Sequence, residues 1–299
     1  MSNWKKYKNG NYTVHIDLDT GTKIRENDLD NLTPAFAENM DVKITDYCEL
    51  GCKMCHEGSS TNGKHGDILN EKFINSLHPY QEVAIGGGNP LSHPDLLQFL
   101  KMLKDRNVIA NITVNQYHFE KYQELIRDLV DNKLIYGIGV SLTNPTEKFI
   151  GLVRQYKNAV IHTINGVTTV KQYKALAHMD LKVLILGYKE LRRGVEFMDN
   201  NFVVIKQTQA ALYDQLKTII DEEWFKVVSF DNLAIEQLNV RRLLTAREWE
   251  QFYMGDDSTF TYFVDLVEGI FAKSSTAPLN ERYELMDSVD EMFERIRKK

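Results

Sequence analysis

The stretch Val42-Lys-Ile-Thr-Asp-Tyr-Cys48-Glu-Leu-Gly-Cys52-Lys-Met-Cys55 decides the fold, because it places a cysteine cluster directly after a short apolar strand. The chain has three cysteines, and all of them lie in this segment with the spacing C-x3-C-x2-C. An odd number of closely spaced cysteines is poorly suited to a disulfide framework. Three thiolates on one loop can instead hold three corners of a cubane cluster and leave the fourth iron open. The segment therefore favours metal or redox chemistry.

The place of this loop after a strand is as informative as its spacing. In βα-barrels the chemistry is concentrated at the carboxyl ends of the strands, and the loop follows the apolar run that ends at Thr45. Gly51 allows the loop to turn tightly, because glycine adopts backbone angles closed to other residues. We therefore expect three sulfur atoms at the carboxyl end of the first strand of a sheet.

Short β-rich runs alternate with helical segments along the middle of the chain. The strand candidates are residues 41–45, 82–85, 108–114, 136–142, 159–164, 181–186 and 225–230. Helix candidates between them include residues 94–105 and 119–130, each with apolar side chains on one face. This alternation predicts a parallel sheet, either open or closed into a partial barrel.

The two ends of the chain do not continue this alternation of strands and helices. Residues 11–26 alternate polar and apolar around Asp19-Thr20-Gly21, which predicts a β-hairpin. After Asp231 we expect a helix near 246–253, a β-like run over 259–272 and an amphipathic helix from about Glu281. The predicted division is an N-terminal extension over 1–37, a core over 38–231 and a C-terminal extension over 232–299 packed on the core.

Composition restricts the partners. The net charge is −6 and no long lysine or arginine run is present, so nucleic acid is an unexpected partner. The first residues contain no apolar signal region, and no run of about 18 apolar residues occurs. We expect a cytoplasmic protein without a membrane segment.

The cysteine motif resembles that of the radical S-adenosylmethionine (SAM) superfamily, in which C-x3-C-x2-C follows the first barrel strand. The resemblance implies an α/β fold: a partial (β/α)6 TIM-like barrel with an N-terminal β-hairpin and C-terminal α/β extensions. It also implies one 4Fe-4S cluster on Cys48, Cys52 and Cys55, whose open iron is chelated by SAM. Reductive cleavage of SAM would give a 5′-deoxyadenosyl radical that abstracts hydrogen from a substrate. Met54 occupies the place of an aromatic residue that usually contacts the adenine, and a thioether can also pack on a purine.

A glycine-rich stretch follows the second strand candidate. In the family, a Gly-Gly-Glu-Pro stretch at this place binds the amino group of SAM through backbone carbonyls and the glutamate. Here Gly87 and Gly88 match and Asn89 replaces the glutamate, although an amide carbonyl can still accept from an ammonium group. A tight turn before the next helix is the alternative reading of the glycines.

Polar and glycine residues at three later strand ends complete the expected SAM site. The resemblance assigns Ser141 to the ribose or carboxylate, with Asn115 as a second candidate, and Ile164 with Gly166 to the adenine. Each is equally compatible with an ordinary strand-end or turn residue. No catalytic residue is assigned.

Several polar residues admit two readings. His56, Glu57, His65 and Asp67 form either a substrate or lid loop or a plain surface loop. Asp231, Asn232 and Glu236 either face substrate or begin a helix with an N-cap.

Two further protein classes compete with the enzyme. One is a structural zinc site in which His56 is the fourth ligand, although structural zinc normally uses two separated ligand pairs. The other is a non-catalytic binding module, zinc- or cluster-stabilised, on a degenerate barrel. A protein that contains zinc and lacks absorption at about 400 nm would have a zinc site and no thiolate-ligated iron.

The chain has no fourth cysteine, which limits the reaction. A second cysteine-ligated cluster is excluded, and a cysteine-quenched epimerisation or a sulfur insertion is disfavoured. The expected partners are a small-molecule or peptide substrate and a low-potential electron donor of the flavodoxin or ferredoxin type.

Overall fold

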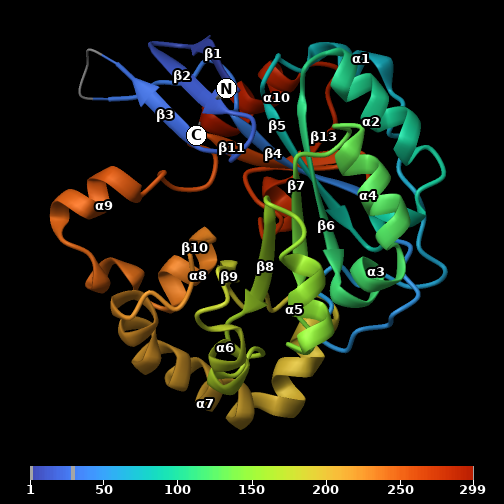
Figure 1. Cartoon of the computed structure of the whole chain (residues 1–299). Helices are drawn as coiled ribbons and strands as arrows, with labels where there is room; N and C mark the ends of the chain where they lie inside the picture. Colours follow the sequence, from blue (N-terminus) through green and yellow to red (C-terminus); the bar gives the residue numbers. More distant parts are fainter. Residues whose placement is uncertain (1–2, 28–30, 299) are drawn as a thin grey trace.

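The computed structural model describes residues 3–27 and 31–298, and its centre is one long sheet (Figure 1). The strand order is β10-β9-β8-β7-β6-β5-β4-β11-β12-β13. Strands β4 to β10 follow one another in sequence order and pair in parallel, β11 adds in parallel beside β4, and β12 and β13 add antiparallel. The bounds of these strands are β4 Asn39–Thr45, β5 Glu82–Gly87, β6 Ile109–Asn115, β7 Gly137–Ser141, β8 Ala159–Ile164, β9 Lys182–Leu186, β10 Val227–Phe230, β11 Thr261–Asp265, β12 Ile270–Ala272 and β13 Tyr283–Glu284.

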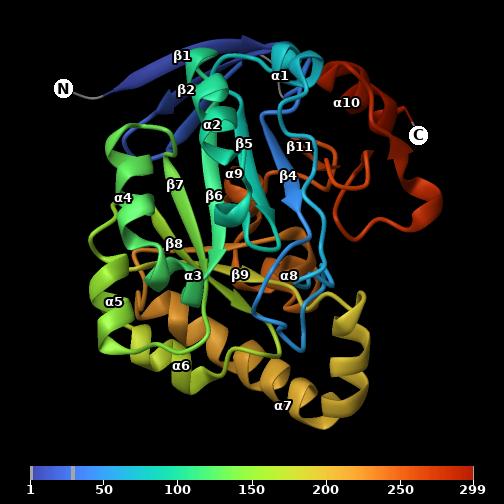
Figure 2. The same ribbon diagram turned by 90° about the vertical axis from the view of Figure 1, so that its right-hand side faces the viewer.

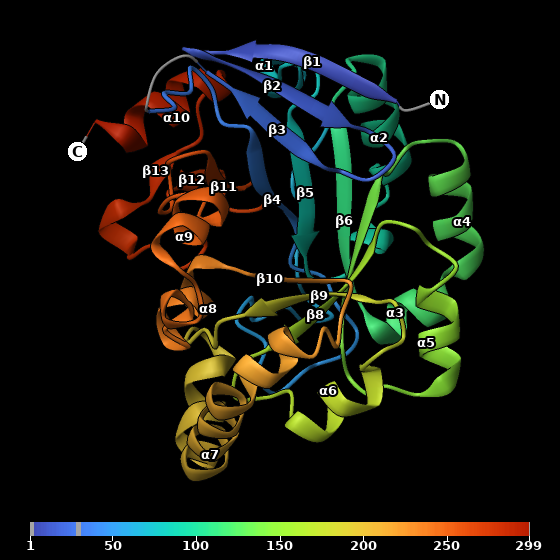
Figure 3. The same ribbon diagram turned by 60° about the vertical axis from the view of Figure 1, so that its left-hand side comes forward.

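The predicted α/β fold is confirmed, and each of the seven strand candidates is a strand of this sheet. The sequential parallel run continues past the sixth strand of the expected (β/α)6 barrel to a seventh, β10. The intervening helices lie along the outer face of the sheet (Figures 2 and 3). Their apolar stripes meet the buried strand residues, such as Val42, Ile85 and Ile112, in one continuous core.

Ten α-helices are present in the described residues. They are α1 Glu71–Ser76, α2 Leu96–Asp105, α3 Gln116–Lys121, α4 Gln123–Asp131, α5 Glu147–Val153, α6 Val170–Leu176, α7 Arg193–Asp221, α8 Asn232–Gln237, α9 Ala246–Phe252 and α10 Val289–Arg297. Short 3₁₀ helices occur at Pro90–Ser92, Val240–Leu243 and Leu279–Glu281. The single helix predicted over 119–130 is wrong: Tyr122 leaves the helical region at φ −107°, ψ 34° and separates α3 from α4.

The C-terminal elements agree only in part with the prediction. The helix near 246–253 and the β-rich run over 259–272 are confirmed as α9 and the β11–β12 hairpin. The start of the last helix at about Glu281 is wrong, because a 3₁₀ turn and β13 occupy that region. Helix α10 begins at Val289, where the Ser288 side chain accepts from the backbone N–H of Glu291.

The predicted N-terminal hairpin is confirmed as β2 (Tyr12–Asp17) and β3 (Lys23–Glu26), to which β1 (Trp4–Asn9) adds an antiparallel edge (Figure 3). This small sheet covers the amino ends of the central strands. Its anchor is Glu38, just before β4, which is 1% exposed and accepts from Tyr12 at 2.7 Å and from Nε of Arg25 at 2.8 Å. The opposite, carboxyl edge of the central sheet stays free of the hairpin.

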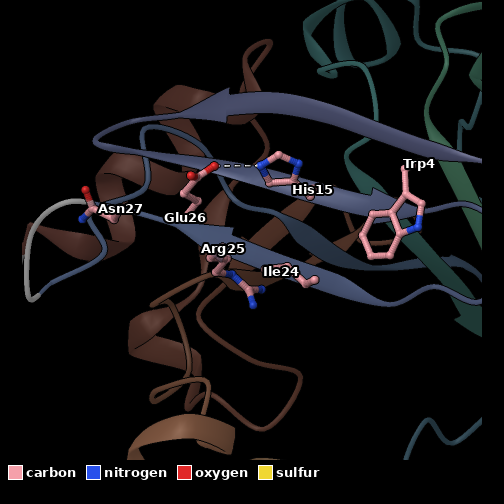
Figure 4. A pocket seen from close by; sticks show the side chains of 6 residues that line it. All are labelled: Trp4, His15, Ile24, Arg25, Glu26 and Asn27. Atoms are coloured by element: carbon pink, nitrogen blue, oxygen red, sulfur yellow. Dashed lines mark hydrogen bonds and ion pairs between the residues drawn. The ribbon is translucent and has the colours of Figure 1, made fainter.

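The outer face of the small sheet carries a shallow hollow of about 670 Å³ (Figure 4). It is lined by Trp4, His15, Ile24, Arg25, Glu26 and Asn27, with His15 paired to Glu26 at 3.0 Å. This hollow belongs to the sheet that covers the amino ends of the barrel strands. Among the helices of the described segments, none combines the length and apolar character needed to cross a membrane.

Candidate functional site

The cysteine loop leaves the carboxyl end of β4 and folds back on itself. The backbone N–H of Cys48 donates to the carbonyl of Ser60 at 2.9 Å, and that of Cys55 donates to the carbonyl of Cys52 at 3.2 Å. Gly51 has a φ of +58°, as the predicted tight turn requires. All three cysteines are free and partly buried. The loop therefore presents three thiols at the edge where βα folds hold their chemistry.

Arg193, the first residue of α7, fixes this loop from the segment that follows β9. Its guanidinium donates to the backbone carbonyls of Cys52 at 3.0 Å, Gly58 at 3.2 Å and Ser59 at 2.8 Å. Nothing in the sequence revealed this contact, because the residues it joins are about 135 positions apart. The helix that follows β9 thus determines where the second cysteine lies.

Substituting Arg193 with methionine should release the loop, because three carbonyls lose a charged donor. We expect a loss of about 1–3 kcal/mol in the free energy of unfolding, measured by denaturant titration. Reconstituted iron per chain should fall in parallel. Arg247→Met, at an exposed position on α9, is the control. Equal stability of the two variants would show that the contacts of Arg193 with the loop do not stabilise the protein.

Burial affects the thiols themselves. It raises the pKa of Cys48 and of Cys52, while the positive charge of Arg193 acts in the opposite direction on Cys52. A thiol with a raised pKa is less reactive as a free nucleophile. These side chains are therefore better suited to coordination, in which a metal stabilises the thiolate, than to nucleophilic catalysis.

The glycine-rich stretch lies directly against the start of the cysteine loop. Backbone N–H groups of Gly88 and Asn89 donate at 2.7 Å to the carbonyls of Thr45 and Tyr47. A Cβ on Gly87 would lie 2.3 Å from the carbonyl oxygen of Thr45, and one on Gly88 would lie 2.2 Å from that of Tyr47. Close approach of two backbones therefore explains both glycines.

The inner face of the sheet is polar, in contrast to the helix-covered face. The parallel register puts Thr113 beside Gly139, Asn115 beside Ser141, and Ser141 beside His162. No atom lies within 4 Å of a Cβ built on Gly86, so open space remains beside the second strand. A lumen lined by hydroxyl, amide and imidazole groups can hydrogen-bond a polar ligand.

His162 was missed by the sequence reasoning, although the alternation Ile161-His162-Thr163-Ile164 places it on the inner face. Its ring lies over Gly139, where a Cβ would be 2.3 Å from Cε1. Burial lowers the pKa of His162 to about 4, so the imidazole is neutral at neutral pH. A neutral imidazole can both donate and accept a hydrogen bond.

The residues expected to contact SAM are only partly gathered. Asn115 and Ser141 are neighbours in register, and the Asn115 side chain also caps α3 by accepting from the backbone of Tyr117. Ile164 ends β8, and the site above Gly166 is filled by Ile205 and Gln209 of α7. Met54 is partly buried, with its carbonyl near Gly194.

A buried charge cluster behind the cysteine loop was also missed. Lys43 on β4 is 2% exposed, and its ammonium lies 2.8 Å from Asp46, 3.3 Å from Glu57 and 3.0 Å from Asp265. Burial alone would raise the pKa of Glu57, but His56 and nearby lysines outweigh it and lower the pKa to about 2. The cluster joins β4, the loop and β11. Polar residues alternating with Met40, Val42 and Ile44 were the available signal.

A second group of ligand-type side chains lies beside the first cysteine. Cys48, Glu49 and His118 bring their donor atoms within 4.8 Å of one another. His118 on α3 is fully buried, and its Nε2 lies 3.2 Å from the Glu49 carboxylate. Glu49 also accepts from the side-chain amide of Asn89 at 3.3 Å. The cysteine loop and the glycine-rich stretch are therefore joined through side chains as well as backbone.

Each of the four polar residues singled out in the segment after Cys55 makes a polar contact. His56 pairs with Glu57 at 3.1 Å, His65 contacts the Thr45 hydroxyl at 2.8 Å, and Asp67 accepts from the backbone of Leu69 at 3.3 Å.

The segment at the end of β10 shows a helix N-cap. Asp231 accepts from the backbone N–H of Ala234 at 2.7 Å and so caps α8. Asn232 donates to Asp257 at 2.7 Å. Glu236 lies within α8.

Comparison with known proteins agrees with this geometry. The family model of the radical SAM superfamily matches residues 42–190. A probable GTP 3′,8-cyclase of Archaeoglobus fulgidus is 28% identical over 156 residues, which are 50% of this chain and 49% of that protein. One of Methanococcus maripaludis strain C5 is 29% identical over 94 residues, 29% of this chain and 31% of that protein. The matches thus span less than half the length of these relatives.

Solved structures show the same fold. Streptococcus suis SuiB bound to S-adenosylmethionine superposes with a TM-score of 0.65 at 11% identity, covering 100% of this chain and 90% of that one. SuiB bound to precursor peptide SuiA superposes with a TM-score of 0.57 at 10% identity, covering 91% and 82%. With the cysteine spacing, the sheet order and the family match in agreement, the chain belongs to the radical SAM superfamily of enzymes.

Proposed function

We propose that the chain binds one 4Fe-4S cluster through Cys48, Cys52 and Cys55, binds SAM beside it, and uses the pair to abstract hydrogen from a substrate. The observation that carries the proposal is the position of three free thiols on one loop at the carboxyl edge of a parallel sheet. The adjoining glycine-rich stretch is held against that loop by two backbone hydrogen bonds. The proposed cluster and cofactor sites are therefore contiguous.

The residues present fit an iron–sulfur cluster better than a single zinc ion. Zinc needs its ligands gathered around one atom. In the described part of the chain, the ligand group gathered within 4.8 Å is Cys48, Glu49 and His118, and it takes in neither Cys52 nor Cys55. A cluster in which each thiolate has its own iron accommodates the wider spacing of the three thiols.

When bound, the reduced cluster and SAM would supply a 5′-deoxyadenosyl radical. The chain's own residues would bind and orient the cluster and SAM. Arg193 and Gly88 hold the cysteine loop in place, and Asn115, Ser141 and His162 offer hydrogen bonds in the lumen. The sheet and its helices screen that lumen from solvent, which protects a reactive species.

For the substrate we propose a small molecule or a peptide, and for the electron donor a flavodoxin or ferredoxin. The polar side chains on the inner face of the sheet support the first part. The fold neighbour SuiB has been crystallised with a precursor peptide. A cytoplasmic location, which keeps thiols reduced, fits the free cysteines.

The test is SAM cleavage. Anaerobically reconstituted protein given dithionite and SAM should form 5′-deoxyadenosine, and Cys52→Ala should reduce the product to the level without protein. The matched control is Ser59→Ala, which leaves the thiols intact. Equal product from wild type and Cys52→Ala, or none from iron-loaded wild type, would refute the proposal and favour a binding module.

A further inference from the structure

The ammonium end of the proposed SAM site lacks a charge that the family resemblance expects. Asn89 stands where the Gly-Gly-Glu-Pro stretch has its carboxylate, and an amide has no net charge. An ammonium group is a donor only, and an ionised acceptor adds to its hydrogen bond a charge–charge attraction that a neutral amide cannot supply. A carboxylate near Asn89 would supply the missing charge.

The side-chain amide of Asn89 is oriented so that its oxygen can accept a hydrogen bond from a ligand. Its side chain is fully buried, and its Nδ2 donates to Glu49 at 3.3 Å. A carboxylate can only accept, so this contact orients the amide with nitrogen toward Glu49 and oxygen away from it. Across the described residues, that Oδ1 atom has no hydrogen-bond partner. A buried acceptor without a donor is costly, which points to a ligand donor.

Glu49 lies where a longer side chain at position 89 would reach. Glutamate exceeds asparagine by one methylene group, and the Glu49 carboxylate lies 3.3 Å from the end of the Asn89 side chain. Its side chain is 27% exposed, so a ligand can reach it. On α3, His118 lies 3.2 Å from the same carboxylate oxygen, Oε2, and Lys121 lies 3.4 Å from the other oxygen, Oε1.

We infer that Glu49 supplies, from the cysteine loop, the carboxylate that is missing at position 89, and that Glu49 and Asn89 together bind the SAM ammonium group. The inference rests on the proposed function. It makes Glu49 a SAM-binding residue that lies beside a cluster ligand, so the cysteine loop holds both cluster and cofactor.

The test measures binding without turnover. SAM affinity is determined by equilibrium dialysis on iron-loaded, unreduced wild type, Glu49→Gln and the double variant Glu49→Gln/Asn89→Glu. Glu49→Gln should weaken SAM binding about tenfold or more, and the double variant should recover most of that loss. Glu124→Gln, exposed on α4, is the matched control and should bind as wild type does.

A second ligand separates a local charge effect from a damaged site. 5′-Methylthioadenosine shares the adenosine of SAM but lacks its ammonium group, so its affinity should be equal in wild type and Glu49→Gln. Unchanged SAM affinity in Glu49→Gln, or an equal loss for both ligands, would overturn the inference. Wild type that binds SAM and forms 5′-deoxyadenosine keeps the proposed function in either case, whereas iron-loaded wild type that does neither refutes the function as well.

Discussion

Lys43→Met should be the most destabilising single change, at about 3–5 kcal/mol, because it leaves three carboxylates around an uncharged side chain. Methionine is unbranched like lysine, one non-hydrogen atom shorter and uncharged, and Lys43 is 2% exposed. The ion pairs to Asp46, Glu57 and Asp265 join β4, the cysteine loop and β11. Denaturant titration of the metal-free protein measures the loss.

The control for this change is Lys72→Met. Lys72 pairs with Asp287 at 2.8 Å, but both side chains are well exposed, at 73% and 66%. An exposed pair contributes about 0–1 kcal/mol. Similar losses for the two variants would mean that the buried cluster is no more important than a surface ion pair.

Gly88→Ala should cost about 3 kcal/mol, the upper end of the usual range for overpacking. The added methyl would lie 2.2 Å from the carbonyl oxygen and 2.8 Å from the carbonyl carbon of Tyr47, and neither backbone can move without shifting the cysteine loop. Iron uptake should therefore fall together with stability, as measured by reconstitution and metal analysis.

Gly86→Ala is the matched control, because no atom lies within 4 Å of its added methyl. Its stability should stay within about 1 kcal/mol of wild type, since alanine also restricts the unfolded chain. If Gly86→Ala and Gly88→Ala lose the same stability, close backbone approach is not the reason for the glycine at 88.

The central sheet was readable from sequence because each buried strand is a short run of branched apolar residues. Strand β8 matches its predicted range of residues 159–164, and the others differ by at most a few residues at their ends. Helix α7 escaped detection. Its apolar run Phe202-Val203-Val204 lies on the exposed side, which obscures the spacing of the buried residues around the break at Asn201.

The site was predictable only where one local segment carries it. The three cysteines are close together in the sequence, and so are the residues of the glycine-rich stretch. The spacing within each motif could therefore be recognised. Arg193, Asp265 and His118 come from distant segments, and only the tertiary fold brings them to the loop. Glu49 directly follows Cys48 in the sequence, but its contact with Asn89 depends on how the cysteine loop and the glycine-rich stretch meet.

The predicted division at residues 37 and 231 stays a proposal. Residues after 231 contribute β11 to the central sheet beside β4, and Asp265 at its end pairs with Lys43. Variants that truncate the chain at 231 would remove that partner from the charge cluster. Function and stability of the core should therefore be measured on the full chain.

Metal analysis of anaerobically prepared protein tests the central claim most directly. After reconstitution we predict about four iron and four sulfide per chain, with broad absorption near about 400 nm. Cys48→Ala, Cys52→Ala and Cys55→Ala should each lose that absorption. Stoichiometric zinc with no iron–sulfur absorption in wild type would contradict the account and leave a zinc-stabilised binding module.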